Sequence, residues 1–357
     1  RLLVLLTKAD KLNRSEAQMA LSTAQQALAD MSSDTADIGV ALFSALSKQG
    51  VDDAALALHG WAGKAGMSAA VRCWDEVLPG GITLACRGAG TGHPRVVLLH
   101  GFPEAAFIWD DVMQRLAART ATVAPNLRGY AGSSAPTEVA AYRPKALIGD
   151  VAALIQSIGA PIDLLVAHDW GGALAWGLAA SRPELMKRLL IINSPHPATF
   201  LRDLRDDAAQ QAASGYMNFL CRPDAEQLLA ADDYARVFRF FNAPAWLTPA
   251  VRDQYRAVWA QGLTGPLNYY RASPLRPAVA PTDAINTLVL PDEAVTVRVP
   301  TTLLWGEQDK ALLPGLLRGL ERWVPQLDVQ RVPDASHWLI HEQPDRVVDQ
   351  ILALLSP

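Results

Sequence analysis

The stretch from Val166 to Gly172 places one carboxylate where it could act as a nucleophile. It reads Val-Ala-His-Asp-Trp-Gly-Gly, follows the apolar run Ile162–Val166 and precedes the helix-like stretch Ala173–Ala180. This pattern predicts a strand, a tight turn and a helix, with Asp169 on the turn. A carboxylate in that place can displace a leaving group at an sp³ carbon and form an ester that water must later hydrolyse. Asp169 is therefore the candidate nucleophile, and the candidate substrates are carbon electrophiles with an oxygen or halide leaving group.

Two backbone amides near this turn are candidate oxyanion donors. The α/β-hydrolase fold presents its nucleophile on a strand-to-helix turn, and it takes one N–H from the loop after the third strand and one from the residue after the nucleophile. Here the loop is His100-Gly101-Phe102-Pro103-Glu104, after the apolar run Val96–Leu99. The fold thus assigns the amides of Phe102 and Trp170, each typically worth about 3 kcal/mol toward the oxyanion on Asp169.

Hydrolysis of the ester needs a base and a group that orients it. His337 follows the last predicted strand, where the fold places its histidine, and can accept a proton at neutral pH. Asp309 follows the seventh strand in Trp305-Gly306-Glu307-Gln308-Asp309 and is the candidate acid, with Glu307 as its competitor. Asn193 occupies the corresponding place after the sixth strand and carries no charge. The order Asp169, Asp309, His337 is the order of nucleophile, acid and histidine in this fold.

The remaining histidines receive structural interpretations. We expect His100 and His168 beside the oxyanion loop and the turn, and His59, His93 and His196 at the surface or in turns. His337 and His341 are four residues apart, a spacing that could hold a metal on one helix face. Since no HExxH pattern or third ligand accompanies them, we expect no metal site.

Several motifs together show that residues 67–357 resemble a microbial or soluble-type epoxide hydrolase. The matching segments are His100–Glu104, Leu127-Arg128-Gly129-Tyr130, His168–Gly172, Pro195-His196-Pro197, Gly306 with Asp309, and Ser336-His337-Trp338. Three positions depart from the usual pattern: Asn126 replaces Asp, Ala131 replaces Gly, and Ala167 replaces Gly.

The resemblance implies two tyrosines that hold the epoxide oxygen and protonate it as the ring opens. Tyr216 matches the first and Tyr270 the second, with Tyr269 as the rival for the second role. Phenols stay protonated at neutral pH and suit a departing alkoxide. We also expect Tyr269 and Trp109 to contact substrate, and Phe238, Phe240 and Trp246 are further candidates for the pocket lining. The expected partners are an epoxide and water, and no cofactor is required.

Two other functions stay open. The first is a haloalkane or haloacid dehalogenase that uses the same Asp169. Against it, fluoroacetate dehalogenases tend to have Arg after the nucleophile, where this chain has Trp170, and haloalkane dehalogenases usually have Asn where this chain has Phe102. The second is a non-catalytic protein that binds a small ligand in the same pocket.

The elements that must position these residues follow an alternating pattern of apolar strands and helices. We predict strands at Arg72–Val77, Ile82–Cys86, Val96–Leu99, Ala121–Ala124, Ile162–Val166, Leu189–Ile192, Thr301–Trp305 and Val329–Val332. Helices are predicted at Ala146–Ser157, Gly172–Ala180, Pro314–Val324 and Asp345–Leu355. The alternation stops between about 197 and 298, which predicts a helical lid inserted into the sheet. The expected fold is an α/β-hydrolase fold with a mostly parallel, eight-stranded sheet and helices on both faces.

Residues 1–66 have a different pattern. The strand-like run Leu2–Leu6 leads into Thr7-Lys8-Ala9-Asp10, and Val40–Phe43 leads into Ser44-Ala45-Leu46. This pair of motifs resembles the C-terminal third of small bacterial ribosome-assembly GTPases, where they clasp the guanine base. No GxxxxGK[ST] phosphate loop occurs in the sequence, so we expect no GTPase activity. We expect a truncated fragment fused to a complete enzyme, and the alternative is a helical extension that packs on the enzyme.

Composition is that of an ordinary globular protein. The chain has 357 residues, is 50% hydrophobic and carries a formal net charge of −4, which argues against nucleic acid or an anionic membrane as a partner. The three cysteines (Cys73, Cys86 and Cys221) form no CxxC pair, and the apolar start Leu2–Leu6 is too short for a membrane span. We expect a cytoplasmic bacterial protein, monomeric or homodimeric.

Overall fold

The computed structural model describes residues 2–7, 9–31, 38–42, 44, 47, 51 and 70–356. The chain divides into two compact units, Arg1–Ser68 and Ala69–Pro357. Within the described part of the chain, none of the helices is long and apolar enough to cross a membrane.

Among its described residues, the first unit has two parallel strands and one long helix. Strand β1 (Leu2–Leu6) pairs with β2 (Ile38–Leu42), and α1 (Arg14–Met31) connects them. Helix α1 starts at a capping box: the Asn13 side chain accepts from the amides of Ser15 and Glu16 at 3.0 Å, and the Glu16 carboxylate accepts from the Asn13 amide at 2.9 Å. The predicted strand Leu2–Leu6 is confirmed. The second strand starts two residues earlier than predicted, and Lys8, Phe43, Ala45 and Leu46 lie outside the described residues.

The second unit contains the predicted eight-stranded sheet, in the order β10-β9-β8-β7-β5-β6-β4-β3. Strand β4 pairs antiparallel with β3 and β6, and the other neighbours are parallel. Every predicted strand is present, with ends that differ by up to three residues. The strands are β3 (Arg72–Val77), β4 (Thr83–Ala89), β5 (Pro94–Leu99), β6 (Ala121–Pro125), β7 (Ile162–His168), β8 (Met186–Ile192), β9 (Thr301–Gly306) and β10 (Leu327–Val332).

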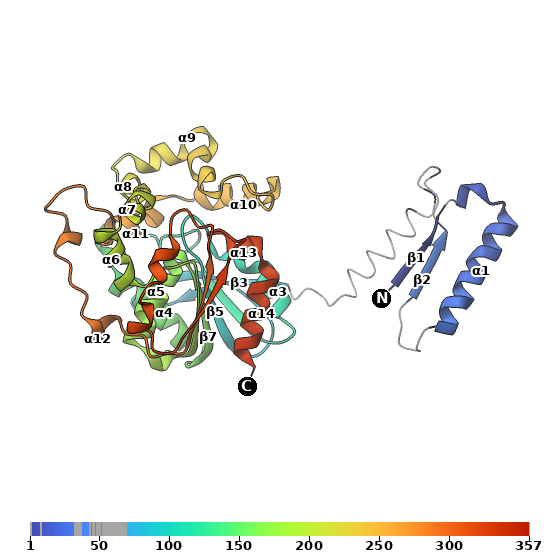
Figure 1. The fold of residues 1–357 in the computed structure, drawn as a ribbon, viewed down its shortest axis with the longest axis horizontal. Helices are drawn as coiled ribbons and strands as arrows, with labels where there is room; N and C mark the ends of the chain where they lie inside the picture. Colours follow the sequence, from blue (N-terminus) through green and yellow to red (C-terminus); the bar gives the residue numbers. More distant parts are fainter. Residues whose placement is uncertain are drawn as a thin grey trace. The chain divides into compact units, whose positions relative to one another are not determined.

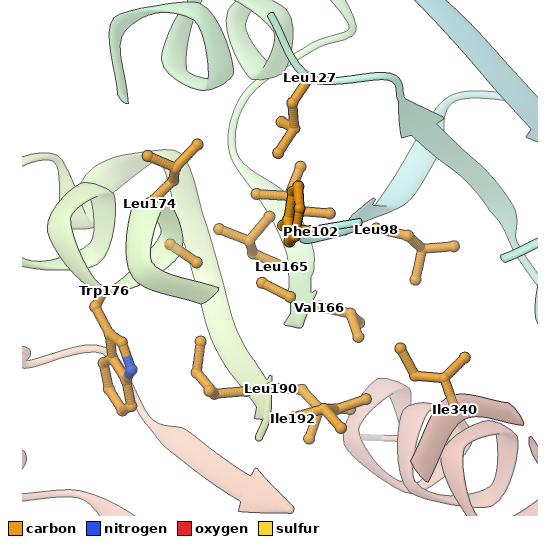
Figure 2. Close-up of a cluster of buried hydrophobic side chains, with 14 of the residues drawn as sticks. Leu98, Phe102, Leu127, Leu165, Val166, Leu174, Trp176, Leu190, Ile192 and Ile340 are labelled. Atoms are coloured by element: carbon orange, nitrogen blue, oxygen red, sulfur yellow. The ribbon is translucent and has the colours of Figure 1, made fainter. Parts of the chain in front are cut away.

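Helices cover both faces of this sheet. Helices α3 (Asp110–Leu116) and α14 (Pro344–Leu355) lie together on one face, and α4 (Pro144–Ser157) and α5 (Asp169–Ser181) on the other (Figure 1). The central strands read as continuous apolar runs because both faces are covered, and Val96–Leu99 and Leu164–Ala167 are fully buried. Figure 2 shows Leu174 and Trp176 of α5 beside Leu165, Val166, Leu190 and Ile192 of the strands. This packing holds the ends of β5 and β7, where the candidate residues lie.

The prediction of a helix at Pro314–Val324 is wrong. Only two short 3-10 turns form there, at Pro314–Leu317 and Leu320–Arg322. Gly319 separates them with φ of +71°, a left-handed backbone that a continuous helix cannot contain. The apolar periodicity of the segment therefore reflects burial of Leu316, Leu317 and Leu320 rather than a helix. Helices α3 and α13 (Leu339–Glu342) were not predicted.

A helical insert occupies the chain between β8 and β9. It contains α6 (Pro197–Asp206), α7 (Ala208–Ala213), α8 (Tyr216–Leu220), α9 (Ala225–Phe238), α10 (Pro249–Trp259), α11 (Thr264–Ala272) and α12 (Asp292–Val295). Side chains cap several of these helices: Asp207 accepts from the amides of Ala209 and Gln210, and Thr248 caps α10. Helices α8 to α11 lie together beyond one end of the sheet (Figure 1).

Candidate active site

Asp169 lies at a sharp change of backbone direction between β7 and α5. His168 is the last residue of β7, and Asp169 opens α5 with φ of +49°, a conformation that costs free energy in a non-glycine residue. The surrounding glycines make room for it, since a Cβ on Gly101 would overlap the Asp169 carboxylate and one on Gly172 would overlap Ser194. The Ser194 hydroxyl donates to the Asp169 carbonyl at 2.7 Å. The strained turn therefore projects the carboxylate beyond the end of the sheet.

The two candidate oxyanion donors flank this carboxylate. The Phe102 amide donates to Oδ1 of Asp169 at 2.7 Å. Trp170 lies in the first turn of α5, where helix geometry leaves amides without an acceptor inside the helix. Positive potential from the start of the helix and from these N–H groups therefore faces the Asp169 carboxylate.

His337 lies between Asp309, the candidate acid, and Asp169, the candidate nucleophile. Its Nδ1 is 2.7 Å from Oδ2 of Asp309, and its Nε2 is 3.8 Å from Oδ2 of Asp169. Burial lowers the pKa of His337, but the Asp309 and Asp169 carboxylates outweigh it and raise the pKa to about 9. The competing candidate, Glu307, instead pairs with Arg331 at the surface.

Asp309 is held by more partners than the sequence indicated. Its Oδ1 accepts from the amides of Ala311 at 2.8 Å and Leu312 at 2.9 Å, and its Oδ2 accepts from the Asn193 side chain at 2.9 Å. Burial raises the pKa of Asp309, but His337 and these donors outweigh it and lower the pKa. Asn193, which the sequence indicated only as an uncharged residue, thus helps to hold the Asp309 carboxylate in place.

The helical insert brings Tyr216 and Tyr270 to the same place. Tyr216 starts α8, Tyr270 lies in α11, and their ring centroids are 6.2 Å apart. Burial raises the pKa of both phenols, and the Asp169 carboxylate raises them further. Tyr269 differs because its hydroxyl donates to the Arg128 carbonyl at 2.8 Å. The Tyr269 hydroxyl is thus engaged by the backbone.

A cavity of about 270 Å³ contains Asp169 and both tyrosines. Its lining is largely apolar and includes Trp170, Leu174, Phe200, Tyr216, Tyr269, Tyr270, Leu288 and Leu290. Trp109 is not among the lining residues: its side chain is fully buried in the core, because it ends a short 3-10 turn that packs against β5, β6 and α3. Phe238, Phe240 and Trp246 do not line this cavity either.

A buried carboxylate that the sequence did not single out lies behind the site. Glu104 is fully buried, and its Oε1 accepts from the Tyr255 hydroxyl at 2.7 Å and lies 2.6 Å from Nε2 of His341. Its Oε2 is 3.3 Å from Nδ1 of His168. Burial raises the pKa of Glu104, but His341 and His168 outweigh it and lower the pKa. Nε2 of His168 is also 2.9 Å from the His337 carbonyl, so this cluster contacts the loop that carries His337.

The predicted positions of two further histidines, His100 and His196, can be compared with the structure. His100 is buried beside the oxyanion loop as expected: its Nε2 accepts from the Leu127 amide at 3.1 Å, and burial lowers its pKa to about 4. His196 was expected at the surface or in a turn; it lies in the loop before α6, but a place at the surface is wrong. It is buried, caps α6 through the Ala198 amide and lies 2.9 Å from the Val295 carbonyl. His59 lies outside the described residues, and within the described part of the chain no group of three or more candidate ligands gathers around a metal position.

Comparisons with known proteins agree with this arrangement. A family model described as "alpha/beta hydrolase fold" matches residues 94–344. The AB hydrolase superfamily protein YfhM of Bacillus subtilis is 34% identical over 290 residues, which cover 79% of this chain and 96% of that protein. Epoxide hydrolase 4 of Mus musculus is 30% identical over 301 residues, covering 81% of this chain and 80% of that protein. The crystal structure of Bacillus megaterium epoxide hydrolase in complex with an inhibitor superposes with a TM-score of 0.72 at 30% identity, covering 79% of this chain and 99% of that one.

The family is therefore established by fold and sequence alike. The model match spans the sheet and the insert from β5 to the start of α14. The curated relatives are covered over most of their own length. The chain belongs to the α/β-hydrolase fold family and, within it, to the epoxide hydrolases.

Proposed function

We propose that the second unit hydrolyses a small-molecule epoxide to a vicinal diol through a covalent ester on Asp169. Membership of the family supports the reaction. The different contacts of the two carboxylate oxygens of Asp169 support this residue as the nucleophile. Oδ1 accepts from the Phe102 amide, whereas Oδ2 faces His337 at 3.8 Å without a hydrogen bond. Oδ2 is the oxygen that attacks, and Oδ1 is the oxygen that carries the later oxyanion.

In the first step, Asp169 Oδ2 forms a bond to one ring carbon and the bond from that carbon to the epoxide oxygen breaks. The electron pair stays on the epoxide oxygen, which takes a proton from Tyr216 or Tyr270. Both phenols line the cavity beside Asp169, and their raised pKa keeps them protonated at neutral pH. The products of this step are a hydroxyalkyl ester and a phenolate that is later reprotonated from solvent.

In the second step, His337 takes a proton from water, and the water oxygen attacks Cγ of Asp169. The oxyanion forms on Oδ1, where the amides of Phe102 and Trp170 stabilise it. Collapse of the tetrahedral intermediate breaks the bond between Cγ and Oδ2. Oδ2 takes the proton from His337 and leaves as a hydroxyl of the diol, and the carboxyl group of Asp169 releases its proton to solvent. Asp169 is regenerated with one oxygen from water.

The charge on Asp169 couples the two steps. The free carboxylate is one of the charges that raise the pKa of His337 to about 9. Esterification removes that charge, so the pKa of His337 falls after the first step and the imidazole loses its proton more readily. His337 thus becomes a competent base once the ester exists.

The single observation that carries this proposal is the contact of one Asp169 oxygen with the Phe102 amide while the other faces His337. A single turnover of styrene oxide in ¹⁸O-water tests it. We expect the label in Asp169, found by mass spectrometry of the peptide that contains it, and an unlabelled diol. Label in the diol after one turnover would mean direct attack by water and would refute the ester.

The dehalogenase alternative has weaker support. A halide leaves as an anion and needs no proton, so two phenols that line the cavity beside the nucleophile favour an oxygen leaving group. A chloroalkane assayed alongside styrene oxide distinguishes the two, and we expect chloride release to be far slower than diol formation. A non-catalytic binder would give no labelled Asp169 at all.

We propose that the insert from α6 to α12 acts as the lid of this site, because it supplies both phenols while the sheet supplies Asp169 and His337.

For the first unit we infer descent from the guanine-recognition part of a ribosome-assembly GTPase. Ser44 Oγ donates to Asp10 Oδ1 at 2.5 Å, and this hydrogen bond lowers the pKa of Asp10. It connects the second motif, which contains Ser44, with the first motif, which contains Asp10. Residues 1–66 contain no phosphate loop, so we expect this segment by itself to bind no GTP. A measurable affinity in calorimetric titration with GTP would contradict this expectation.

A further inference from the structure

The cavity that contains Asp169 follows one face of helix α5. Asp169, Trp170, Ala173, Leu174 and Gly177 all line it, and this spacing places them on the same face of the helix. An α-helix rises about 1.5 Å per residue, so the step from Asp169 to Gly177 covers about 12 Å. The cavity therefore offers space at a distance from the nucleophile.

Apolar side chains from other segments line the same cavity. Leu147 and Ile148 come from α4, and Leu288 and Leu290 come from the loop before α12. Among the residues that line the cavity, Asp169 is the only one with a charged side chain. An alkyl or aryl group can thus be desolvated here, whereas a cavity of this kind offers little compensation for burying a charged group.

The groups that would bind the epoxide ring lie at the start of α5. The ring centroid of Tyr270 is 5.1 Å from that of Trp170, which directly follows the nucleophile in the helix. The ring centroid of Tyr216 is 6.2 Å from that of Tyr270. An epoxide held between the two phenols and Asp169 therefore lies at this end of the helix, about two turns from Gly177.

Gly177 lacks a side chain at a place where the cavity has little room to spare. A Cβ on Gly177 would lie 2.5 Å from Cδ1 of Ile148, well inside the roughly 3.5–4.0 Å at which carbon atoms pack. Ile148 could shift to admit a single carbon, but a longer side chain would have to occupy the cavity. Gly149 of α4 provides a contrast, because it is exposed, does not line the cavity, and a Cβ on it would meet nothing within 4 Å.

We propose that the face of α5 between Trp170 and Gly177 binds an extended apolar substituent of the epoxide, and that Gly177 sets the length of substituent that the cavity accepts. This inference rests on the proposed epoxide hydrolysis. Long side chains in helices lean toward the N-terminus of the helix, so a larger residue at position 177 would cover the space over Ala173 and Leu174. A long substituent would lose that space, whereas a short one would not reach it.

A series of substrates that differ only in length tests the apolar binding space. The terminal oxides of propene, butene, hexene and octene carry the same ring and a growing alkyl chain. We expect kcat/KM of the unmodified protein to rise by about fourfold for each methylene that is buried. Values that stay equal or fall along the series would overturn the inference.

The role of Gly177 is tested with a matched pair of glycine variants. Gly177→Leu should lower the ratio of kcat/KM for octene oxide to that for propene oxide by roughly tenfold or more. Gly149→Leu makes the same change in the neighbouring helix, outside the cavity, and should leave this ratio unchanged. An unchanged ratio in Gly177→Leu, or an equal change in both variants, would reject Gly177 as the residue that sets substituent length.

A compensating variant separates a filled cavity from a damaged fold. Adding Ile148→Ala to Gly177→Leu removes the side chain that faces position 177 and nearly conserves the total side-chain volume. The double variant should therefore recover most of the lost ratio, and no recovery would overturn the steric role of Gly177. Failure of the proposed function gives a different result, because the unmodified protein would then turn over none of the four epoxides.

Discussion

The Phe102 amide donates to Oδ1 of Asp169 at 2.7 Å, although the two residues are 67 positions apart in the chain. The loop after β5 and the turn after β7 meet because these strands are neighbours in the parallel sheet. This contact assigns different environments to the two Asp169 oxygens before any substrate binds. The predictions below follow from that asymmetry and from the groups that surround it.

Replacing His337 should separate the two chemical steps. In His337→Gln the carboxylate of Asp169 and both phenols remain, so the ester should form and then accumulate because no base activates water. Intact-protein mass spectrometry after incubation with styrene oxide should show an increase equal to the mass of the substrate. Asp169→Asn is the matched control and should show neither adduct nor turnover. Full activity of His337→Gln without an adduct would refute the covalent scheme.

The pKa of His337, raised to about 9, predicts how stability depends on pH. The proton is bound more tightly in the folded than in the unfolded state, so this contribution is fully present below about pH 6.5 and is lost as the pH rises through about 9. Urea unfolding between these limits should show a falling free energy of unfolding. The fall should be smaller in Asp309→Asn, which removes the main charge that holds the proton. An identical pH dependence in the variant would show that His337 does not titrate this way.

The two phenols beside Asp169, Tyr216 and Tyr270, should act in the first step. Tyr216→Phe and Tyr270→Phe should each slow ester formation by about 100-fold, the usual size of a lost general acid, and the double variant should be slower still. Stopped-flow measurement of a single turnover checks this. Tyr269→Phe is the matched control, since its hydroxyl is bonded to the Arg128 carbonyl. It should lower stability by about 1 kcal/mol and leave the first step largely intact. The opposite result would exchange the roles of Tyr269 and Tyr270.

Glu104 should matter mainly for stability. Glu104→Ala leaves the buried His168 and the partly buried His341 without their shared carboxylate, and should lower the free energy of unfolding by about 3–5 kcal/mol at neutral pH. The pKa of Glu104 is lowered, so its contribution is present above the usual glutamate pKa and is lost as the pH falls below it. Urea unfolding at neutral and acidic pH checks both statements. Glu307→Ala, at the surface with Arg331, is the control and should change stability by less than about 1 kcal/mol. Equal effects of the two variants would contradict the assigned role.

The sequence predicted the architecture well because the signals that carry it are local. Apolar runs bounded by polar turns located all eight strands of the second unit, and the strand–turn–helix pattern located Asp169. The positions of His337 and Asp309 followed from strand order alone, since each comes directly after its strand. Where a single residue decides the backbone, as Gly319 does in the segment 314–324, periodicity misled.

Only the tertiary structure shows the contacts between segments that are distant in the sequence. Asn193 meets Asp309, and Glu104 meets His168 and His341, only because strand ends and loops converge at one edge of the sheet. Our proposal of Tyr270 rather than Tyr269 as the second phenol rests on the Arg128 carbonyl, which accepts from the Tyr269 hydroxyl. Adjacent residues of α11 point in directions set by the rotation of the helix and by what it packs against, and no local signal encodes that packing. Residue types and their order determined the possible chemistry, and three-dimensional contacts determined which side chains are free to perform it.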